Sequence, residues 1–236
     1  MKETHKKSQI RLNPVDDLAL HLASSVKRLD NEIKKNIQDR EVIVTNIASH
    51  LIMGKGKKIR PLLTLLIAKM LRYKGSAHFN LAVCIEFIHN ATLLHDDVID
   101  DAKIRRGKTA ANLVWGNKLS ILVGDYLLSK SFKLMVKDKS IKVLEILSNT
   151  SLILARGQIQ DANNISNAHL TEKDYLELIF AKTAELFSVS CYLPAVLSNK
   201  SLKIQNNLKS FGENFGMAFQ LSDDYLDYFG NSKKMG

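Results

Sequence analysis

The chain has 236 residues, a formal net charge of +10 and 45% hydrophobic residues. This length supports one substantial core, the apolar content excludes intrinsic disorder as the main state, and two cysteines cannot form a disulfide scaffold. Eleven glycines and three prolines are few for this length, which disfavours a turn-rich β-sandwich and favours long helices. We therefore expect an all-α fold with a single domain over residues 1–236.

Apolar residues recur at helical spacing along most of the chain. A first helical stretch is expected over residues 16–52, and Pro61 suits the first turn of a helix that runs to about residue 73. Further helices are expected over residues 79–101, 117–136, 140–162, 171–198 and 201–229. No segment shows a convincing strand alternation, and no internal repeat is found.

No targeting or membrane-spanning segment is evident in the sequence. Residues 1–15 lack the apolar stretch of a secretory signal. The longest apolar run, at residues 62–68, is far shorter than the ~20 residues that span a bilayer. We therefore expect a cytoplasmic protein with reduced thiols.

The basic charge balance is compatible with a nucleic acid or with a polyanionic small substrate. Many lysines are scattered, as at positions 133, 137, 139 and 142, which is typical of a solvated face. No recognition motif and no basic stripe interleaved with aromatic residues is present. No nucleic-acid partner is therefore expected.

Several acidic residues cluster near the end of the third expected helix. At about 100° per residue, His89, Asp96 and Asp100 share one stripe, and Asp97 lies further round. Like charges at this spacing weaken a helix, so a cation should compensate. Mg²⁺ fits because it takes one or two carboxylates together with water and phosphate oxygens. The alternative is a helix end that carries solvated acids.

The same Asp-Asp-x-x-Asp spacing recurs late in the last expected helix. Gln220, Asp223, Asp224 and Asp227 fit within one arc of about 100°. Two such clusters on different helices would repel each other across a cavity. A highly charged anion bridged by metal ions would resolve this repulsion.

Basic residues cluster at three places between or before the acidic ones. Gly56–Pro61 forms a basic loop before a helix N-terminus, which is a natural position for a phosphate group. Arg105 and Arg106 follow the first acidic cluster, and Lys182-Thr183 interrupts an apolar face. Each is compatible with an ordinary surface feature, but the set suits a diphosphate.

Six segments together resemble the trans-polyprenyl diphosphate synthases, and the long-chain octaprenyl and solanesyl branch most closely. They are residues 56–61, 88–100, 105–107, 115–118, 181–184 and 220–227. The resemblance runs from about residue 12 to the last residue. It implies an isoprenoid-synthase type helical bundle around a deep central cavity, Mg²⁺ as cofactor and a homodimer. It also implies a prenyltransferase that condenses isopentenyl diphosphate head-to-tail onto an allylic diphosphate, giving a long-chain all-trans polyprenyl diphosphate for isoprenoid (quinone side-chain) biosynthesis.

The resemblance further implies roles for individual residues. Isopentenyl diphosphate would be bound by Lys57, Arg60, His89 and Arg106. The allylic substrate would be bound by Arg105, Lys182, Thr183 and Gln220. Magnesium would be held by Asp96, Asp97, Asp100, Asp223, Asp224 and Asp227, and catalysis would depend on Asp96, Asp97, Asp100 and Lys182. Ala91 and Thr92 are small and would leave room for a long product.

Three features depart from the family pattern. Lys58 stands where Arg is usual. The family's Gly-Glu-x-x-Gln segment is expected near Gly157, but the Glu is absent and we expect the segment to be one residue shorter, which puts Gln160 out of register. The chain also ends at Lys233–Gly236, where the family continues, so we expect a truncated domain that lacks the family's C-terminal helices.

Two alternatives to an active prenyltransferase remain open. One is a non-catalytic or degenerate member, such as a binding subunit of a hetero-oligomeric synthase. The other is a terpene cyclase, which shares the fold and the first acidic cluster. The Arg105-Arg106 pair and the 56–61 loop favour a second diphosphate substrate and so argue against a cyclase.

Overall fold

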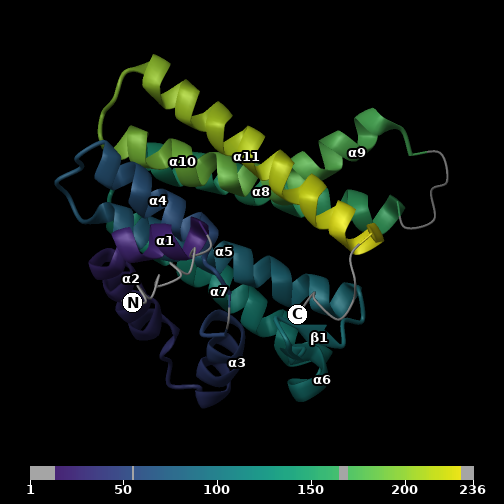
Figure 1. Cartoon of the computed structure of the whole chain (residues 1–236). Helices are drawn as coiled ribbons and strands as arrows, with labels where there is room; N and C mark the ends of the chain where they lie inside the picture. Colours follow the sequence, from purple (N-terminus) through teal and green to yellow (C-terminus); the bar gives the residue numbers. More distant parts are fainter. Residues whose placement is uncertain (1–13, 55, 165–169, 230–236) are drawn as a thin grey trace, which may run out of the picture.

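The computed structural model describes residues 14–54, 56–164 and 170–229. Over these ranges the chain is a bundle of α-helices with one short hairpin of two-residue strands (Figure 1). The expected all-α fold class is confirmed. Lys233–Gly236, where the sequence suggested a truncation, lie outside the described residues.

The expected helix over residues 16–52 is wrong as a single element. It is divided into α1 (Pro14–His21), α2 (Ala23–Ile37) and α3 (Val42–Ile52). After α2, the Asp39 carboxylate accepts a hydrogen bond from the backbone N–H of Glu41 at 3.2 Å, and Thr45 Oγ1 donates to the carbonyl of Ile37 at 3.2 Å. Such local side-chain hydrogen bonds compete with the helical ladder and end α2 here.

The centre of the bundle is α5 (Ala77–Ile99), which packs against α4 (Ile59–Met70) and α7 (Asn117–Lys137). Most of α5 is buried because the helix itself carries apolar residues around most of its circumference. The hairpin of β1 (Ile104–Arg105) and β2 (Lys108–Thr109) and the short α6 (Ala111–Trp115) connect α5 to α7. Arg106 and Gly107 both have positive φ, as a two-residue hairpin turn requires.

The second half of the bundle contains α8 (Ile141–Asn164), α9 (Glu172–Ile179), α10 (Glu185–Leu197) and α11 (Leu202–Phe229). The expected helix over 171–198 is interrupted by a π-helical turn, η1 (Phe180–Ala184). Sequence periodicity cannot resolve such a turn because it adds a single residue to the helical repeat. The expected ranges for α5, α7, α8 and α11 agree with the structure within two residues at each end.

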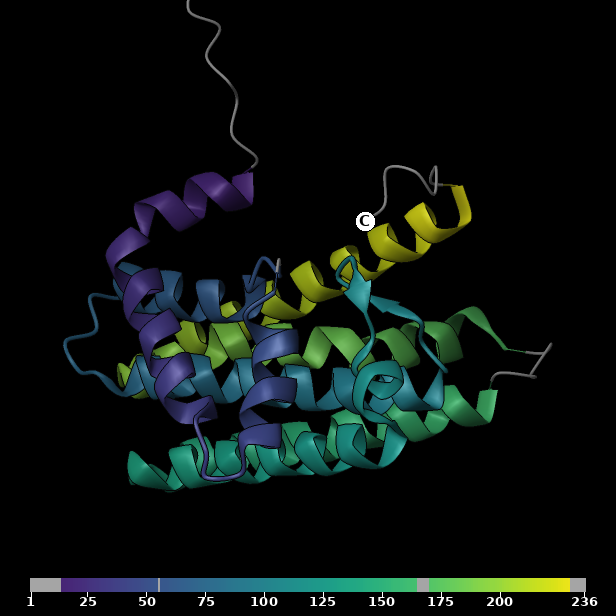
Figure 2. The same cartoon turned by 90° about the horizontal axis from the view of Figure 1, so that it is seen from below.

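Figure 2 shows how the bundle is oriented along its length. α8 and α11 begin at one end, and both run toward the opposite end, where the hairpin lies. The acidic and basic motifs therefore gather toward the hairpin end. Within the described residues, no helix is both long and apolar enough to cross a membrane.

Candidate active site

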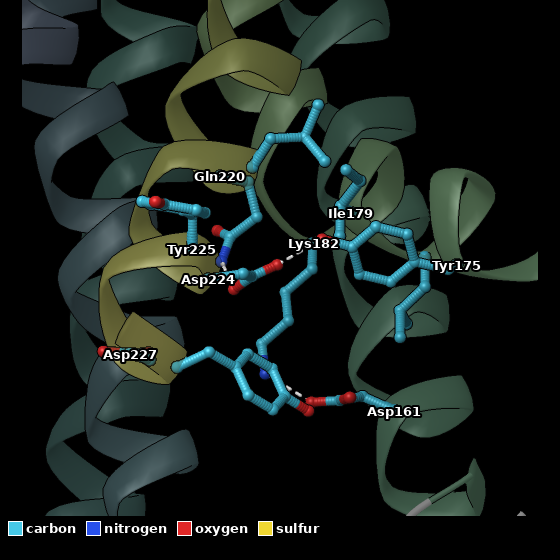
Figure 3. Close-up of a pocket in the computed structure, with 11 residues that line it drawn as sticks. Asp161, Tyr175, Ile179, Lys182, Gln220, Asp224, Tyr225 and Asp227 are labelled. Atoms are coloured by element: carbon cyan, nitrogen blue, oxygen red, sulfur yellow. Dashed lines mark hydrogen bonds and ion pairs between the residues drawn. The ribbon is translucent and has the colours of Figure 1, made fainter. Parts of the chain in front are cut away.

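A pocket of about 570 Å³ opens between α8, the α9–η1 segment and α11 (Figure 3). Its charged and polar lining combines residues that are far apart in the sequence. They include Asp161, Tyr175, Lys182, Gln220, Asp224 and Asp227. The pocket therefore joins the second acidic cluster to the Lys182-Thr183 motif.

Hydrogen bonds connect η1, α11 and α9 along one wall of this pocket. Thr183 Oγ1 donates to Gln220 Oε1 at 2.6 Å, and Gln220 Nε2 donates to Asp224 Oδ1 at 2.8 Å. The hydroxyl of Tyr175 donates to the other oxygen of Asp224. Both oxygens of this carboxylate are thus oriented by neighbouring side chains, whereas Asp227 is exposed beside them.

Asp223 also belongs to this cluster and lies close enough to Arg60 of α4 to interact with its charge. Burial raises the pKa of Asp223, and the negative charges of Asp227 and Asp224 raise it further, whereas Arg60 opposes the shift. The three carboxylates therefore repel one another in the free protein. A cation bound among them would relieve this repulsion.

The π-helical turn brings Lys182 to the acidic side of the pocket. Lys182 Nζ forms an ion pair with Asp161 of α8. Burial by itself would lower the pKa of Lys182, but the bond to Asp161 and the charges of Asp96 and Asp100 raise it. The close approach of α8 to η1 needs Gly157, because a Cβ there would lie 2.9 Å from the Cβ of Ala181.

The first acidic cluster reaches the same region from α5. Gln158 Nε2 donates to Asp96 Oδ1 at 3.0 Å, and Asp100 caps the end of α5 in an exposed position. Burial raises the pKa of Asp96, Asp100 adds to the rise, and Lys182 and Gln158 oppose it. Asp96 and Asp100 thus lie close enough to Lys182 to interact with its charge.

Asp97 lies in a different environment from Asp96 and Asp100. Its side chain is 0% exposed, and its Oδ1 accepts a hydrogen bond from Arg105 Nε at 2.7 Å. Its Oδ2 is buried and has no hydrogen-bond partner. The structure therefore places Asp97 against Arg105 of the hairpin, away from the stripe that carries Asp96 and Asp100.

A second group of cations lies between α4 and α5. Arg60 Nη1 lies 3.3 Å from His89 Nε2, and the guanidinium lies over the ring of Phe187 at 4.2 Å from its centroid. Burial lowers the pKa of Arg60 to about 10, with Glu86 opposing this effect. Burial, followed by the charges of Arg60 and Arg106, holds the pKa of His89 well below its ordinary value.

Arg106 completes this group from the hairpin turn. Its Nη1 donates to the carbonyl of Leu51 at 2.9 Å and to Asn90 Oδ1 at 3.4 Å. Gly56 lies so close that a Cβ there would meet the guanidinium of Arg106 at 2.7 Å. The basic loop and the hairpin are thus in direct contact.

A buried acid lies beneath these arginines. Glu86 is 1% exposed, and its Oε1 accepts a hydrogen bond from Asn90 Nδ2 at 2.9 Å. Burial raises the pKa of Glu86, whereas Asn90 and the charges of Arg106, Lys58 and Arg60 lower it. The Asn90 amide therefore links Glu86 to Arg106. Sequence analysis assigned no role to either Glu86 or Asn90.

The two lysines of the basic loop behave differently. Lys57 is exposed, whereas Lys58 Nζ donates to Asp30 Oδ1 of α2 at 3.0 Å. Lys58 also adopts a left-handed backbone conformation, with φ of 46°, just before α4. Lys58 therefore ties the loop to α2, and the departure from the usual Arg falls on a residue that is already engaged within the protein.

The two residues expected to govern product length differ in burial. Ala91 is 2% exposed and belongs to the main hydrophobic core. Thr92 is half-buried, and its carbonyl lies 3.4 Å from Gln158 Nε2. Because Thr92 and Asp96 are four residues apart, Thr92 lies one turn before Asp96 on the same face of α5.

The segment after Gly157, expected to be one residue short, lies in the last two turns of α8. α8 is continuous, and Gln158 and Asp161, one and four positions after Gly157, both face the site. Counted from Gly157, these are the two positions that Glu and Gln occupy in the Gly-Glu-x-x-Gln pattern. Gln160 instead lines a separate pocket with Asn163 and Asp174.

Sequence reasoning missed Asp161 and Tyr175. Asp161 follows Gln158 at the i, i+3 spacing of one helical face, which is a signal that could have found it. Tyr175 meets Asp224 across 49 positions of sequence. No local spacing predicts such a contact.

The donor set suits magnesium rather than a softer metal. Among the described residues, no three or more His, Cys, Asp or Glu side chains come together as a ready metal cluster. This arrangement still fits Mg²⁺, which takes one or two carboxylates and completes its shell with water and phosphate oxygens. Asp96 and Asp100 on α5, and Asp223, Asp224 and Asp227 on α11, supply carboxylate oxygens of this kind.

Comparisons with known proteins agree with this architecture. Residues 41–236 match the family described as polyprenyl synthetase. The chain is 36% identical over 220 residues to the octaprenyl diphosphate synthase of Escherichia coli, covering 93% of this chain but 66% of that protein. It is 34% identical to the heptaprenyl diphosphate synthase component 2 of Bacillus subtilis, covering 94% of this chain and 65% of that one.

A solved structure gives the same result. The polyprenyl synthase of Caulobacter crescentus, complexed with calcium and isoprenyl diphosphate, superimposes with a TM-score of 0.91 at 39% identity. The match covers 97% of this chain and 70% of that chain. The helical bundle with paired acidic motifs thus defines an isoprenoid-synthase fold. The chain belongs to the polyprenyl synthetase family, and it spans slightly less than two thirds of the length of the Escherichia coli relative.

Proposed function

We propose that this chain is a trans-prenyltransferase that condenses isopentenyl diphosphate head-to-tail onto an allylic diphosphate. The product would be a long-chain all-trans polyprenyl diphosphate. The observation that carries the proposal is the presence of two anion-binding sites, each with cationic side chains, beside two carboxylate clusters. One site contains Arg60, His89 and Arg106, and the other contains Lys182, Thr183 and Gln220.

The two anion sites suit two different diphosphates. Arg60 is held by His89 and Phe187, and Arg106 by the Leu51 carbonyl and the Asn90 side chain, before any ligand arrives. Both guanidinium groups therefore need little reorganisation to bind the isopentenyl diphosphate. Lys182 lies among Asp96, Asp100 and Asp161 and would bind the allylic diphosphate. Arg105 is engaged by Asp97 and would contribute to the allylic site from the hairpin.

Magnesium held by Asp96, Asp100, Asp223, Asp224 and Asp227 would neutralise the charge of the diphosphate groups. When the allylic C–O bond breaks, its electron pair leaves with the diphosphate, and Lys182 stabilises the charge that develops there. The double bond of isopentenyl diphosphate then forms the new C–C bond with the allylic carbon. The resulting cation loses a proton to the departing diphosphate, which restores a double bond.

Two further parts of the proposal concern assembly and location. A homodimer is supported by exposed apolar side chains along α6 and the start of α7, namely Leu113, Val114, Ile121 and Leu122. A cytoplasmic location is supported by Cys84 and Cys191, which are both buried and unpaired. Sedimentation of the purified chain tests the assembly. A chain that needs a different second subunit would contradict the homodimer, and the name of the Bacillus subtilis relative makes this the natural competing outcome.

Incorporation of radiolabelled isopentenyl diphosphate into a butanol-extractable product tests the activity. The expected result is incorporation that requires both an allylic diphosphate and Mg²⁺ and that stops on chelation. A folded chain that binds both diphosphates but forms no product would favour the non-catalytic alternative. Product formed from the allylic substrate alone would favour a cyclase.

A further inference from the structure

One end of the bundle carries a cluster of cations that the proposed active site does not use. It consists of the α4–α5 loop and the turn between α7 and α8, and we call it the basic end. Both segments lie where α8 begins, opposite to the hairpin (Figure 2). Asn80 Nδ2 at the start of α5 donates to Asp138 Oδ1 in the α7–α8 turn at 2.8 Å, so the two segments are in direct contact.

The exposed charges of the basic end are almost all positive. Within residues 69–77 and 130–145 the exposed cations are Lys69, Arg72, Lys74, Lys133, Lys137, Lys139 and Lys142. The acids within residues 69–77 and 130–145 are Asp138 and Glu145. Asp138 already accepts the bond from Asn80, so Glu145 is the acid left exposed in these segments.

Aliphatic side chains project between these lysines. Ile141 is 82% exposed at the first position of α8, and Val136 is 59% exposed near the end of α7. Val136 shares one helical face with Lys133 and Lys137 because the three stand at i, i+3 and i+4. The surface therefore presents apolar tips surrounded by flexible cations.

The basic end lies far from the diphosphate pocket. Ile141 and Asp161 belong to the same continuous helix, and 20 residues of α8 separate them. At 1.5 Å per residue this separation is about 30 Å. The cations of the basic end therefore cannot contact a substrate bound at Lys182.

We propose that the basic end docks onto the surface of a bilayer that contains anionic lipids. Lysines near such a surface are attracted by its negative potential, and apolar tips gain by insertion among the headgroups. A second copy of this face would be repelled by the like charges. A nucleic acid would gain nothing from Val136 or Ile141, and no exposed aromatic residue stands in these segments to stack on a base.

Docking by this end leaves the substrate pocket facing the aqueous phase. The charged substrates would then enter from water, while the chain is held next to the membrane in which a long polyprenyl product dissolves. This use for product delivery rests on the proposed function. The docking itself does not, because it can be measured without substrate.

Vesicle sedimentation of the purified full chain tests the proposal. We expect the chain to bind vesicles of phosphatidylcholine with phosphatidylglycerol, not vesicles of phosphatidylcholine alone, and to bind less as salt rises. The triple variant Lys137→Glu/Lys139→Glu/Lys142→Glu should bind at least about 100-fold more weakly. The neutral Lys→Gln triple should fall between the two. Ile141→Ser, which changes no charge, should weaken binding several-fold.

A charge-matched control separates a local surface from the overall positive charge. Lys103→Glu/Lys108→Glu/Lys173→Glu reverses three exposed lysines away from the basic end and should weaken binding at least about tenfold less than the Lys137/139/142 reversal does. Equal loss in both triples would overturn the proposal. Unchanged vesicle binding by the Lys137/139/142 variants would also overturn the proposal. The same holds if Ile141→Ser binds vesicles normally and the unaltered protein binds RNA more tightly than vesicles. Because no substrate is present, an inactive chain that docks would refute only the proposed function.

Discussion

Asp97 and Arg105 form an ion pair in which Arg105 Nε donates to Asp97 Oδ1 at 2.7 Å, although both residues belong to motifs expected to contact substrate or metal. The Asp97 side chain is fully buried, so it stabilises the hairpin that follows α5. Asp96, one residue earlier, faces Gln158 and the charge of Lys182. Adjacent carboxylates in one motif thus have different environments.

This difference predicts opposite phenotypes for two neighbouring substitutions. Asp97→Ala should destabilise the fold by about 3 kcal/mol because it leaves the partly buried Arg105 without its partner. Asp96→Ala should leave the free energy of unfolding nearly unchanged but lower isopentenyl diphosphate incorporation by about 100-fold or more. Urea unfolding and the incorporation assay measure the two effects. A stable Asp97→Ala chain that needs a much higher Mg²⁺ concentration for activity would show that Asp97 is a metal ligand after all.

Helical periodicity predicted most of the bundle because packing of amphipathic faces decides where these helices lie. It failed at Asp39, where a side chain bonds to the nearby backbone, and at residues 180–184, where the π turn changes the repeat. For the site, motif spacing placed Gln220 and Asp224 on one helical face, and the structure has them hydrogen-bonded. It could not foresee Tyr175 or Glu86, because their partners come from tertiary packing rather than from local spacing.

Tyr175 should tune metal affinity through Asp224. Its hydroxyl donates to Asp224, so Tyr175→Phe removes an orienting bond while keeping the ring. We expect the Mg²⁺ concentration for half-maximal activity to rise about tenfold, with turnover at saturating Mg²⁺ nearly normal. A Mg²⁺ titration of activity measures this shift. Lys173→Gln, an exposed change on the same helix, is the matched control, and a similar shift in both variants would contradict the role of Tyr175.

Glu86 and Asn90 should position Arg106 for the isopentenyl diphosphate. Asn90→Ala removes the amide that links Glu86 to Arg106. We expect the KM for isopentenyl diphosphate to rise about tenfold, while the KM for the allylic substrate stays unchanged. Asn90→Gln is the conservative comparison and should recover part of the loss. An equal rise in both KM values would indicate general damage to the fold instead.

His89 predicts a pH dependence of stability. Burial and three arginines hold its folded pKa well below the ordinary 6.5, so below about pH 6.5 the unfolded chain binds a proton that the folded chain does not. Stability should therefore fall as the pH drops from 6.5 toward the folded pKa, by at most about 1.4 kcal/mol per pH unit. His89→Gln should flatten this part of the curve. Urea unfolding at pH 5, 6 and 7.5 measures it, and parallel curves for the two chains would rule out His89 as the cause.

Thr92 should influence product length more directly than Ala91. Thr92 is half-buried one turn before Asp96 on the same helical face, whereas Ala91 is packed in the core. Thr92→Phe should therefore shorten the polyprenyl chain by filling the space below the reacting end of the allylic substrate. Ala91→Phe should mainly destabilise the fold, by about 1–3 kcal/mol, because core overpacking forces neighbouring helices apart. Chromatography of the dephosphorylated products, with thermal unfolding of each variant, separates the two effects. Thr92→Ser should keep the wild-type product. An unchanged product length in Thr92→Phe would show that a different residue limits the length of the polyprenyl chain.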